Sequence, residues 1–213
     1  MGPELESIAL SVHRETGLDD PPVDAFELAA LCGMTLRPAR NGRGFASDSV
    51  IAYPARSRRV RQHGVIAHEL GHWALRWAGE DDSEQGADYL AGALLLPRRC
   101  LDTDLKNSWD FSLLRARHVN VSAEMLARRI TQVRDAVATI IDHGQVKSRV
   151  TSPWINGRQW KRMSRWERNL ADQALETEET VYGDELCYAV PVIEGTWRRV
   201  VVVCEAEQLS LRL

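Results

Sequence analysis

The sequence has no hydrophobic run long enough to cross a membrane. Its longest apolar stretches, such as residues 90–96 and 200–204, are far shorter than the roughly 20 residues that a transmembrane helix needs. The first residues, Met1–Glu6, are polar and acidic and do not resemble a secretory signal peptide. We therefore expect a protein that acts in the cytoplasm without membrane contact.

An excess of positive charge and a regular cysteine pattern are also missing. The 27 Lys and Arg residues stand against 30 Asp and Glu, so no global basic field favours nucleic-acid binding. No C-x-x-C motif, internal repeat or low-complexity tract is present. We expect buried free thiols in a reducing compartment, rather than a disulfide framework or a second metal site, for all four cysteines, Cys32, Cys100, Cys187 and Cys204.

One stretch carries recognisable chemistry: His68-Glu69-Leu70-Gly71-His72, which has the form H-E-x-x-H. On a helix, residues four apart project from one face, so two imidazoles can bind one metal ion. Glu69 lies beside the first imidazole and can reach a metal-bound water without binding the metal. Zinc lowers the pKa of its water to about 7, and a carboxylate then takes the proton as the water attacks a carbonyl. The pattern predicts a Zn²⁺ site with Glu69 as catalytic base.

A third ligand is expected on a second, antiparallel helix. Gly79 can end the first helix, and the polar run 80–83 follows it. Asp82 or Ser83 can cap the next helix, which places Glu84 in its first turn. Asp88 lies four residues further on the same face, where it could accept a hydrogen bond from a zinc-bound histidine. Because an isolated H-E-x-x-H match also arises by chance, the alternative is a purely structural helix pair.

These two stretches resemble the ImmA/IrrE zinc metallopeptidases over roughly residues 20–135. The motifs are Ala67-His68-Glu69-Leu70-Gly71-His72 and Glu84-x-x-Ala87-Asp88-x-Leu90-Ala91-x-x-Leu94-Leu95-x-Pro97. The family usually has Asn in place of Asp88 and Phe in place of Leu90. The resemblance implies that His68, His72 and Glu84 bind zinc and that Glu69 is the base. It also implies an intracellular protein substrate, typically a helix-turn-helix repressor of a mobile element or stress response.

Local patterns predict the elements before the metal helix. We expect helices at 4–16 and 23–31, strands at 34–37 and 49–53, and a turn at 41–44. An edge strand near a zinc cleft can pair with an extended peptide, which makes residues 50–53 a candidate for substrate binding. The fold class that we predict is α+β, with a zincin-like metallopeptidase domain over residues 1–135.

Residues 111–133 read as helix, turn, helix and supply the main competing function. Ser122 is a good N-cap, and the second helix carries an apolar stripe of Leu126, Ile130 and Val133. Several arginines accompany these helices, so DNA reading is the alternative to packing. Similar helices occur in the resembling family, where they belong to the domain core. We therefore favour packing and do not expect nucleic-acid binding.

Residues 136–213 predict a small C-terminal α+β region without a catalytic motif. Hairpins are expected at 136–151 and 186–204. Between them a helix over 164–176 would begin with the capping box Ser164-x-x-Glu167. This region could recognise substrate, regulate the protease or complete the core.

Two functions of different classes follow. The first is a zinc-dependent endopeptidase, whose oxyanion donor would come from Tyr53, Tyr89, His63 or His118. The second is a regulatory DNA- or protein-binding protein with a structural or vestigial zinc site. A structural site usually takes four protein ligands and has no use for a base, so Glu69 favours the enzyme. The sequence predicts no particular oligomeric state.

Overall fold

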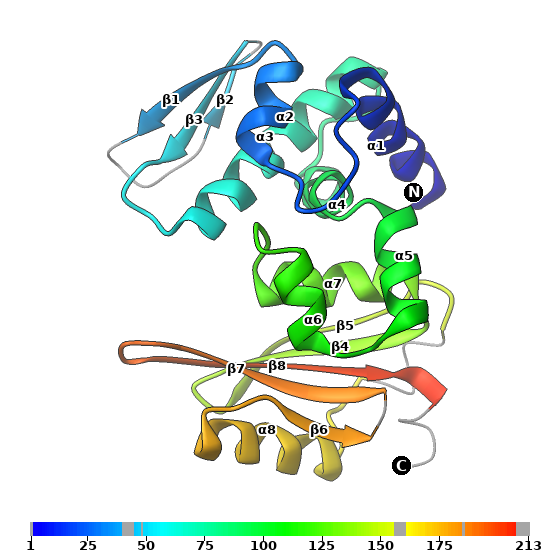
Figure 1. Cartoon of the computed structure of the whole chain (residues 1–213), viewed down its shortest axis with the longest axis vertical. Coiled ribbons are helices and arrows are strands. Elements are labelled where there is room, and N and C mark those ends of the chain that lie inside the picture. The colour runs from blue at the N-terminus through cyan, green and yellow to red at the C-terminus, as the bar shows by residue number, and fades with distance from the viewer. Residues whose placement is uncertain (1, 40–44, 48, 156–160, 185, 208–213) are drawn as a thin grey trace. The chain divides into compact units, whose positions relative to one another are not determined.

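The structure, a computed structural model, is a mixed α+β protein that divides into two compact units. It describes residues 2–39, 45–47, 49–155, 161–184 and 186–207. Unit 1 comprises the chain up to residue 104 together with residues 112–122, and unit 2 comprises residues 105–111 and the chain from 123 onward. Figure 1 labels the elements of both units. The turn expected at 41–44 lies outside the described residues.

Unit 1 combines helices with a three-stranded sheet in the order β1-β3-β2. Its elements are α1 (Gly2–Thr16), α2 (Ala25–Leu31), β1 (Thr35–Ala39), β2 (Phe45–Ala46), β3 (Val50–Pro54), α3 (Arg59–Ala78) and α4 (Glu84–Leu95). Two more helices, α5 (Arg98–Asn107) and α6 (Phe111–Arg117), have residues in both units. The predicted helices and strands are confirmed with small shifts at their ends, while α5 was not predicted.

Strand β3 is the central strand of this sheet. It pairs in parallel with β1 on one side and antiparallel with β2 on the other. Ile51 and Ala52 are both buried, as expected where a strand is covered on two faces. The prediction that residues 50–53 form an edge strand open to a peptide is therefore wrong.

Helices α3 and α4 form the antiparallel pair that the motif spacing predicted. Gly79 ends α3 with φ of 74°, a left-handed conformation that glycine adopts without strain. Ser83 caps α4, and its hydroxyl accepts a hydrogen bond from the Gly86 N–H. A buried stripe of Ile66, Leu70 and Ala74 faces the interior of unit 1.

Unit 2 is built on one antiparallel sheet in the order β5-β4-β8-β7-β6. Its elements are α7 (Ala123–Val133), β4 (Ala136–Asp142), β5 (Gln145–Thr151), α8 (Arg165–Thr177), β6 (Val181–Asp184), β7 (Cys187–Glu194) and β8 (Trp197–Glu205). Helix α8 packs on β6, β7 and β8, while α7 covers the opposite face of the sheet (Figure 1). Both predicted hairpins are confirmed, and pairing of β4 with β8 joins them.

The two helix-turn-helix-like helices lie mainly in different units, α6 in unit 1 apart from Phe111 and α7 in unit 2. Helix α7 packs on β4 and β8 through Leu126, Ala127 and Ile130, which are all fully buried. Arg129 is buried as well, and Arg128 contacts Glu124 and Ser148. The division of the structure therefore places α7 with the C-terminal sheet, whereas the predicted domain boundary follows residue 135. The apolar stripe of α7 covers that sheet.

The cysteines differ from the expectation of four free thiols. Cys187 and Cys204 lie opposite each other on β7 and β8 and form a disulfide, so the prediction is wrong for this pair. The register of the β7–β8 hairpin places them opposite each other, which the spacing of the cysteines alone does not reveal. Cys32 and Cys100 are free, as predicted, although Cys32 is only half-buried.

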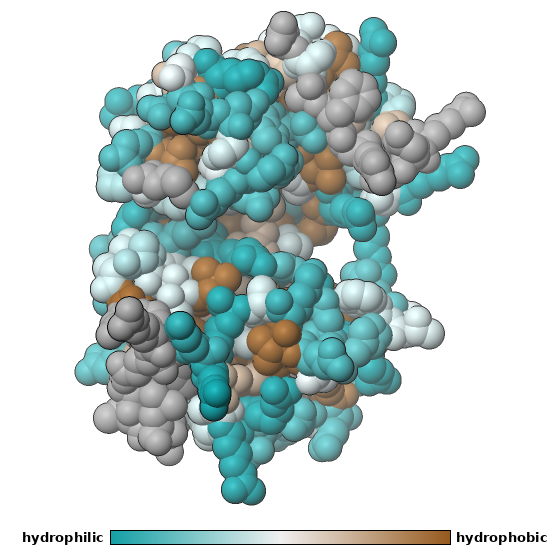
Figure 2. All heavy atoms as spheres, turned by 180° about the vertical axis from the view of Figure 1, so that it is seen from behind, coloured by the Kyte–Doolittle hydropathy of each residue, from teal (hydrophilic) through white to brown (hydrophobic). Residues whose placement is uncertain are grey.

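Nothing in the described part of the chain forms a helix that is long and apolar enough to span a membrane. The face in Figure 2 is mainly hydrophilic, with apolar residues in separate patches. Exposed large apolar side chains occur singly along both units, including Leu10, Leu113 and Trp154. Such scattered residues are ordinary on a protein surface.

Candidate metal centre

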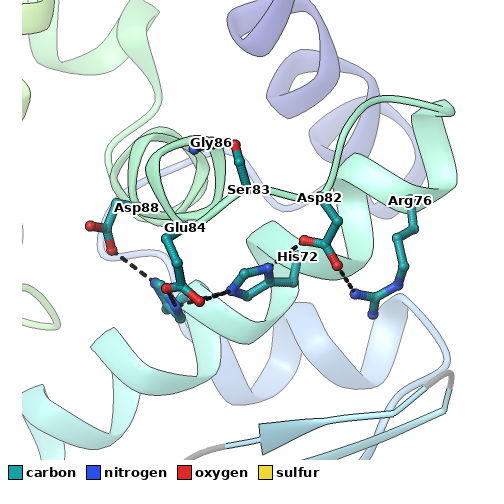
Figure 3. Close-up of polar contacts among 8 residues, drawn as sticks. His72, Arg76, Asp82, Ser83, Glu84, Gly86 and Asp88 are labelled. Atoms are coloured by element: carbon teal, nitrogen blue, oxygen red, sulfur yellow. Dashed lines mark hydrogen bonds and ion pairs between the residues drawn. The ribbon is translucent and has the colours of Figure 1, made fainter.

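Three candidate ligands converge where the start of α4 passes over α3. His68 and His72 lie one turn apart on α3, and Glu84 is the first residue of α4. Their ligand atoms all lie within 4.8 Å of one another. The two Nε2 atoms are 3.2 Å apart, and Glu84 places one carboxylate oxygen 3.3 Å from Nε2 of His68 and the other 3.7 Å from Nε2 of His72. Figure 3 shows the carboxylate of Glu84 beside His72.

This donor set fits a zinc ion. Four ligands in a tetrahedron, each about 2.0–2.1 Å from zinc, are about 3.4 Å from one another. The separation of the two Nε2 atoms lies close to that value, and each Nε2 atom has one of the two Glu84 oxygens at a similar distance. Two imidazole nitrogens and one carboxylate oxygen are also the ligands of a known class of catalytic zinc sites, which keep the fourth position for water.

Each histidine is oriented by a carboxylate on its other ring nitrogen. Nδ1 of His68 is 2.9 Å from Oδ1 of Asp88, the contact that the sequence predicted. Nδ1 of His72 contacts Oδ1 of Asp82, and the second oxygen of Asp82 accepts a hydrogen bond of 2.6 Å from Arg76 (Figure 3). An ionised carboxylate can only accept, so each imidazole donates from Nδ1 and keeps the lone pair of Nε2 for the metal.

Asp82 is the site residue that sequence reasoning missed. The sequence offered Asp82 or Ser83 as the cap of α4, and the structure uses Ser83 for that purpose. Asp82 instead turns back to α3, because the short connector between the helices passes beside His72. The sequence feature that could have indicated this role of Asp82 is Arg76, which follows His72 by one helical turn and can bind a nearby carboxylate.

Glu69 lies on α3 beside the two histidines and is half-buried. Burial raises the pKa of its carboxyl group, an effect that His68 and His72 partly oppose. A carboxylate with a raised pKa takes up a proton more readily than an ordinary glutamate. This property suits a group that must accept a proton during a reaction.

Gly71 allows the two ligand-bearing helices to approach closely. A Cβ atom at this position would lie 2.6 Å from the carbonyl oxygen of Ala87 and 2.9 Å from its Cα atom. Both obstacles are backbone atoms of α4, so any larger residue would push the helices apart. The glycine inside the H-E-x-x-H motif therefore permits the close approach of α4 to the part of α3 that carries the two histidines.

The four residues proposed as oxyanion donors are engaged in other contacts of unit 1. Nδ1 of His63 accepts a hydrogen bond of 3.1 Å from the Ala25 N–H, and Nε2 of His118 is 2.9 Å from Asp104. The hydroxyl of Tyr89 donates to Glu6 over 2.7 Å, and the ring of Tyr53 packs edge-on against Phe26. These contacts do not select one of the four, so an oxyanion donor among them stays a prediction.

Comparisons with known proteins agree with this picture of unit 1. No curated protein matched the chain. Among solved structures, a "Mycobacterium tuberculosis transcriptional regulator" has a similar fold, with a TM-score of 0.72 and 17% identity over 97% of this chain and 78% of that chain. The family model described as the IrrE N-terminal-like domain, Peptidase_M78, matches residues 35–131 and includes every candidate ligand. The resemblance to the ImmA/IrrE family is thereby confirmed, and residues 35–131 form a Peptidase_M78 domain.

Proposed function

We propose that this protein is a zinc-dependent endopeptidase. The observation that carries the proposal is the convergence of His68, His72 and Glu84, whose ligand atoms lie within 4.8 Å of one another, with Glu69 beside them. The Peptidase_M78 domain supports the same conclusion. A zincin-like arrangement of unit 1, with its α3–α4 pair against a small sheet, is part of this proposal.

The residues of the chain have distinct tasks in the proposed reaction. His68, His72 and Glu84 would hold the zinc ion, which when bound lowers the pKa of water and polarises the scissile carbonyl. Glu69 accepts a proton from the attacking water and passes it to the leaving amine. Asp88 and Asp82 keep the imidazoles in the Nδ1–H form.

The substrate that we propose is a specific intracellular protein. By resemblance to the ImmA/IrrE family, a helix-turn-helix repressor of a mobile element or stress response is the leading candidate. The chain would then act in the cytoplasm on a protein partner. Direct binding of nucleic acid is not part of the proposal, because two arginines of α7, Arg128 and Arg129, are engaged within unit 2.

One observation is relevant to the alternative function, a regulatory binding protein. The fold resembles a protein described as a transcriptional regulator over nearly the whole chain. A regulatory binding protein with a structural zinc ion would have the same fold. At 17% identity the likeness shows the fold alone, and a structural site gives Glu69 no task.

The test is the variant Glu69→Gln, which keeps the shape of the side chain and removes the base. We expect it to retain zinc and to lose cleavage by about 10²–10⁴-fold, the usual contribution of a general base. New protein N-termini, identified by mass spectrometry, are compared after incubating an extract of the producing organism with wild type and variant. Glu80→Gln, an exposed glutamate of the connector, is the matched control. Undiminished cleavage by Glu69→Gln would show that the assignment of the base is wrong.

A further inference from the structure

We propose that Arg76 and Asp82 form a positioning pair that fixes both His72 and Glu84 for metal binding. This inference rests on the proposed zinc site and extends it to two residues to which the family comparison assigns no role. Asp82 is the centre of the pair, because one carboxylate oxygen contacts Nδ1 of His72 and the other accepts from Arg76. Figure 3 shows the side-chain contacts that connect Arg76 to Asp82 and Asp82 to His72.

The first effect of the pair is on the ring of His72. A neutral imidazole can carry its proton on either nitrogen, and only the Nδ1–H form presents the Nε2 lone pair to a metal. A carboxylate at Nδ1 stabilises that form and restricts rotation of the ring. Asp82 could make this contact from many positions on a free connector, but Arg76 holds its second oxygen at 2.6 Å.

The second effect is on Glu84. Asp82 ends the connector, Ser83 caps α4, and Glu84 is the first helical residue. Contacts of Asp82 with two residues of α3 therefore fix the point from which α4 begins. The carboxylate of Glu84 is 83% exposed, so packing contributes little to its position. We infer that the connector itself places Glu84 over the two histidines.

The two orienting carboxylates differ in how they are supported. Asp88 is a residue of α4, one turn beyond Glu84, and the helix backbone places it beside His68. Asp82 lies outside both helices and depends on a second contact for its position. This difference explains why a cation accompanies Asp82.

The experiment measures zinc affinity by competition with a chelator for two variants, Asp82→Ala and Arg76→Ala. Loss of a contact to a ligand histidine usually weakens metal binding by about 10–100-fold, which we expect for Asp82→Ala. The matched controls remove the same charges nearby: Asp81→Ala from the connector and Arg61→Ala from α3, both at exposed positions. We expect zinc affinity close to wild type in both controls.

The sign of the Arg76→Ala effect separates positioning from simple electrostatics. Removing a positive charge near a dication should strengthen zinc binding if Coulomb repulsion is the only effect. Positioning predicts the opposite, a weaker affinity than in Arg61→Ala. The double variant should bind no more weakly than Asp82→Ala alone, because Arg76 acts through Asp82.

A second readout requires no metal. Nitrogen chemical shifts of the His72 ring in the zinc-free protein report its tautomer, which we expect to be Nδ1–H in wild type and mixed in both variants. If wild type binds no zinc, the proposed function fails, and the tautomer still decides this inference. Tighter or unchanged zinc binding in Arg76→Ala, or an unchanged tautomer in Asp82→Ala, would overturn it.

Discussion

Two glutamates, one in each unit, show how differently this chain uses its charges. Glu84 in unit 1 is 83% exposed, and its partners are the imidazoles of His68 and His72. Glu167 in unit 2 is 1% exposed and makes a bidentate ion pair with Arg149, which is 7% exposed. The charge of Glu167 is balanced inside the fold. The groups around Glu84 instead converge at the surface, where a cation can bind.

This comparison separates a residue that stabilises the fold from a residue that is a candidate metal ligand. Glu167 also closes the capping box of α8, since it accepts a hydrogen bond from the Ser164 N–H. It is therefore a structural residue of unit 2. Changes at Glu167 should alter unfolding and leave zinc binding intact, whereas changes at Glu84 should do the reverse. The following predictions test that separation, beginning with the largest expected effect.

Breaking the buried ion pair should cost the most stability. Glu167→Ala removes the carboxylate that balances the buried charge of Arg149, and removing one member of such a pair usually destabilises a protein by about 3–5 kcal/mol. Urea unfolding of unit 2 measures the loss, with Glu176→Ala, an exposed change on the same helix, as the control. Zinc affinity should stay at the wild-type value. If Glu167→Ala lowered the free energy of unfolding no more than the control does, the structural role of Glu167 would be contradicted.

Adding one methyl group to the α3–α4 contact should lower both the stability of the protein and its affinity for zinc. Gly71→Ala places a Cβ atom against the backbone of Ala87, and overpacking of this kind usually costs about 1–3 kcal/mol. Because the helices must move apart, zinc affinity should fall as well. Gly183→Ala in β6 of unit 2 is the control, since its Cβ meets side-chain atoms of Leu170 and Trp166, which can move more easily than backbone. Equal effects in both variants would remove the special role of Gly71.

Acid should destabilise zinc-free unit 1 through two buried histidines. Burial lowers the pKa of His63, with Arg59 adding to the effect and Asp24 opposing it. Burial also lowers the pKa of His118, and the hydrogen bond with Asp104 opposes that shift. Both rings favour the neutral form in the folded state, so the unfolded chain binds more protons as the pH falls.

The stability from these two histidines is complete above their unfolded pKa of about 6.5 and is lost as the pH falls through the folded values. Each histidine contributes a slope of at most about 1.4 kcal/mol per pH unit. Urea unfolding of the zinc-free protein at a series of pH values measures the change. Constant stability of unit 1 from neutral to mildly acidic pH would show that neither ring must stay neutral.

The smallest expected effects come from a matched pair of helix caps. Ser83→Ala and Ser164→Ala each remove a side-chain cap, which usually costs about 1 kcal/mol. Only Ser83→Ala should also weaken zinc binding, because Glu84 follows it directly. Chelator competition and urea unfolding on both variants test this difference. Similar zinc affinity in the two variants would mean that the start of α4 does not control Glu84.

The sequence predicted most of the candidate site because its pattern is local. Histidines four residues apart share a helix face by geometry alone, and Asp88 follows Glu84 by the same interval. Gly79 and Ser83 marked the end of α3 and the start of α4, as the structure has them. Hairpin turns and the Ser164 capping box gave the elements of unit 2 in the same way.

The remaining features depend on how separate elements pair with or pass one another. The central position of β3 follows from its pairing with β1 and β2. The residue pattern of a single strand does not predict the order of strands in a sheet. The pairing of Cys187 with Cys204 follows from register across β7 and β8. The contact of Asp82 with His72 depends on the path of the connector. Each required the fold before it could be recognised.

The most direct test of the account is the metal content of the purified protein beside that of Glu84→Ala, measured by elemental analysis. The account predicts about one zinc per chain in wild type, as in a mononuclear site with three protein ligands, and its loss in the variant. The zinc-free variant should unfold at the same urea concentration as zinc-free wild type, because Glu84 is exposed. Wild-type protein without zinc after dialysis against it would contradict the central claim, as would full zinc content in Glu84→Ala.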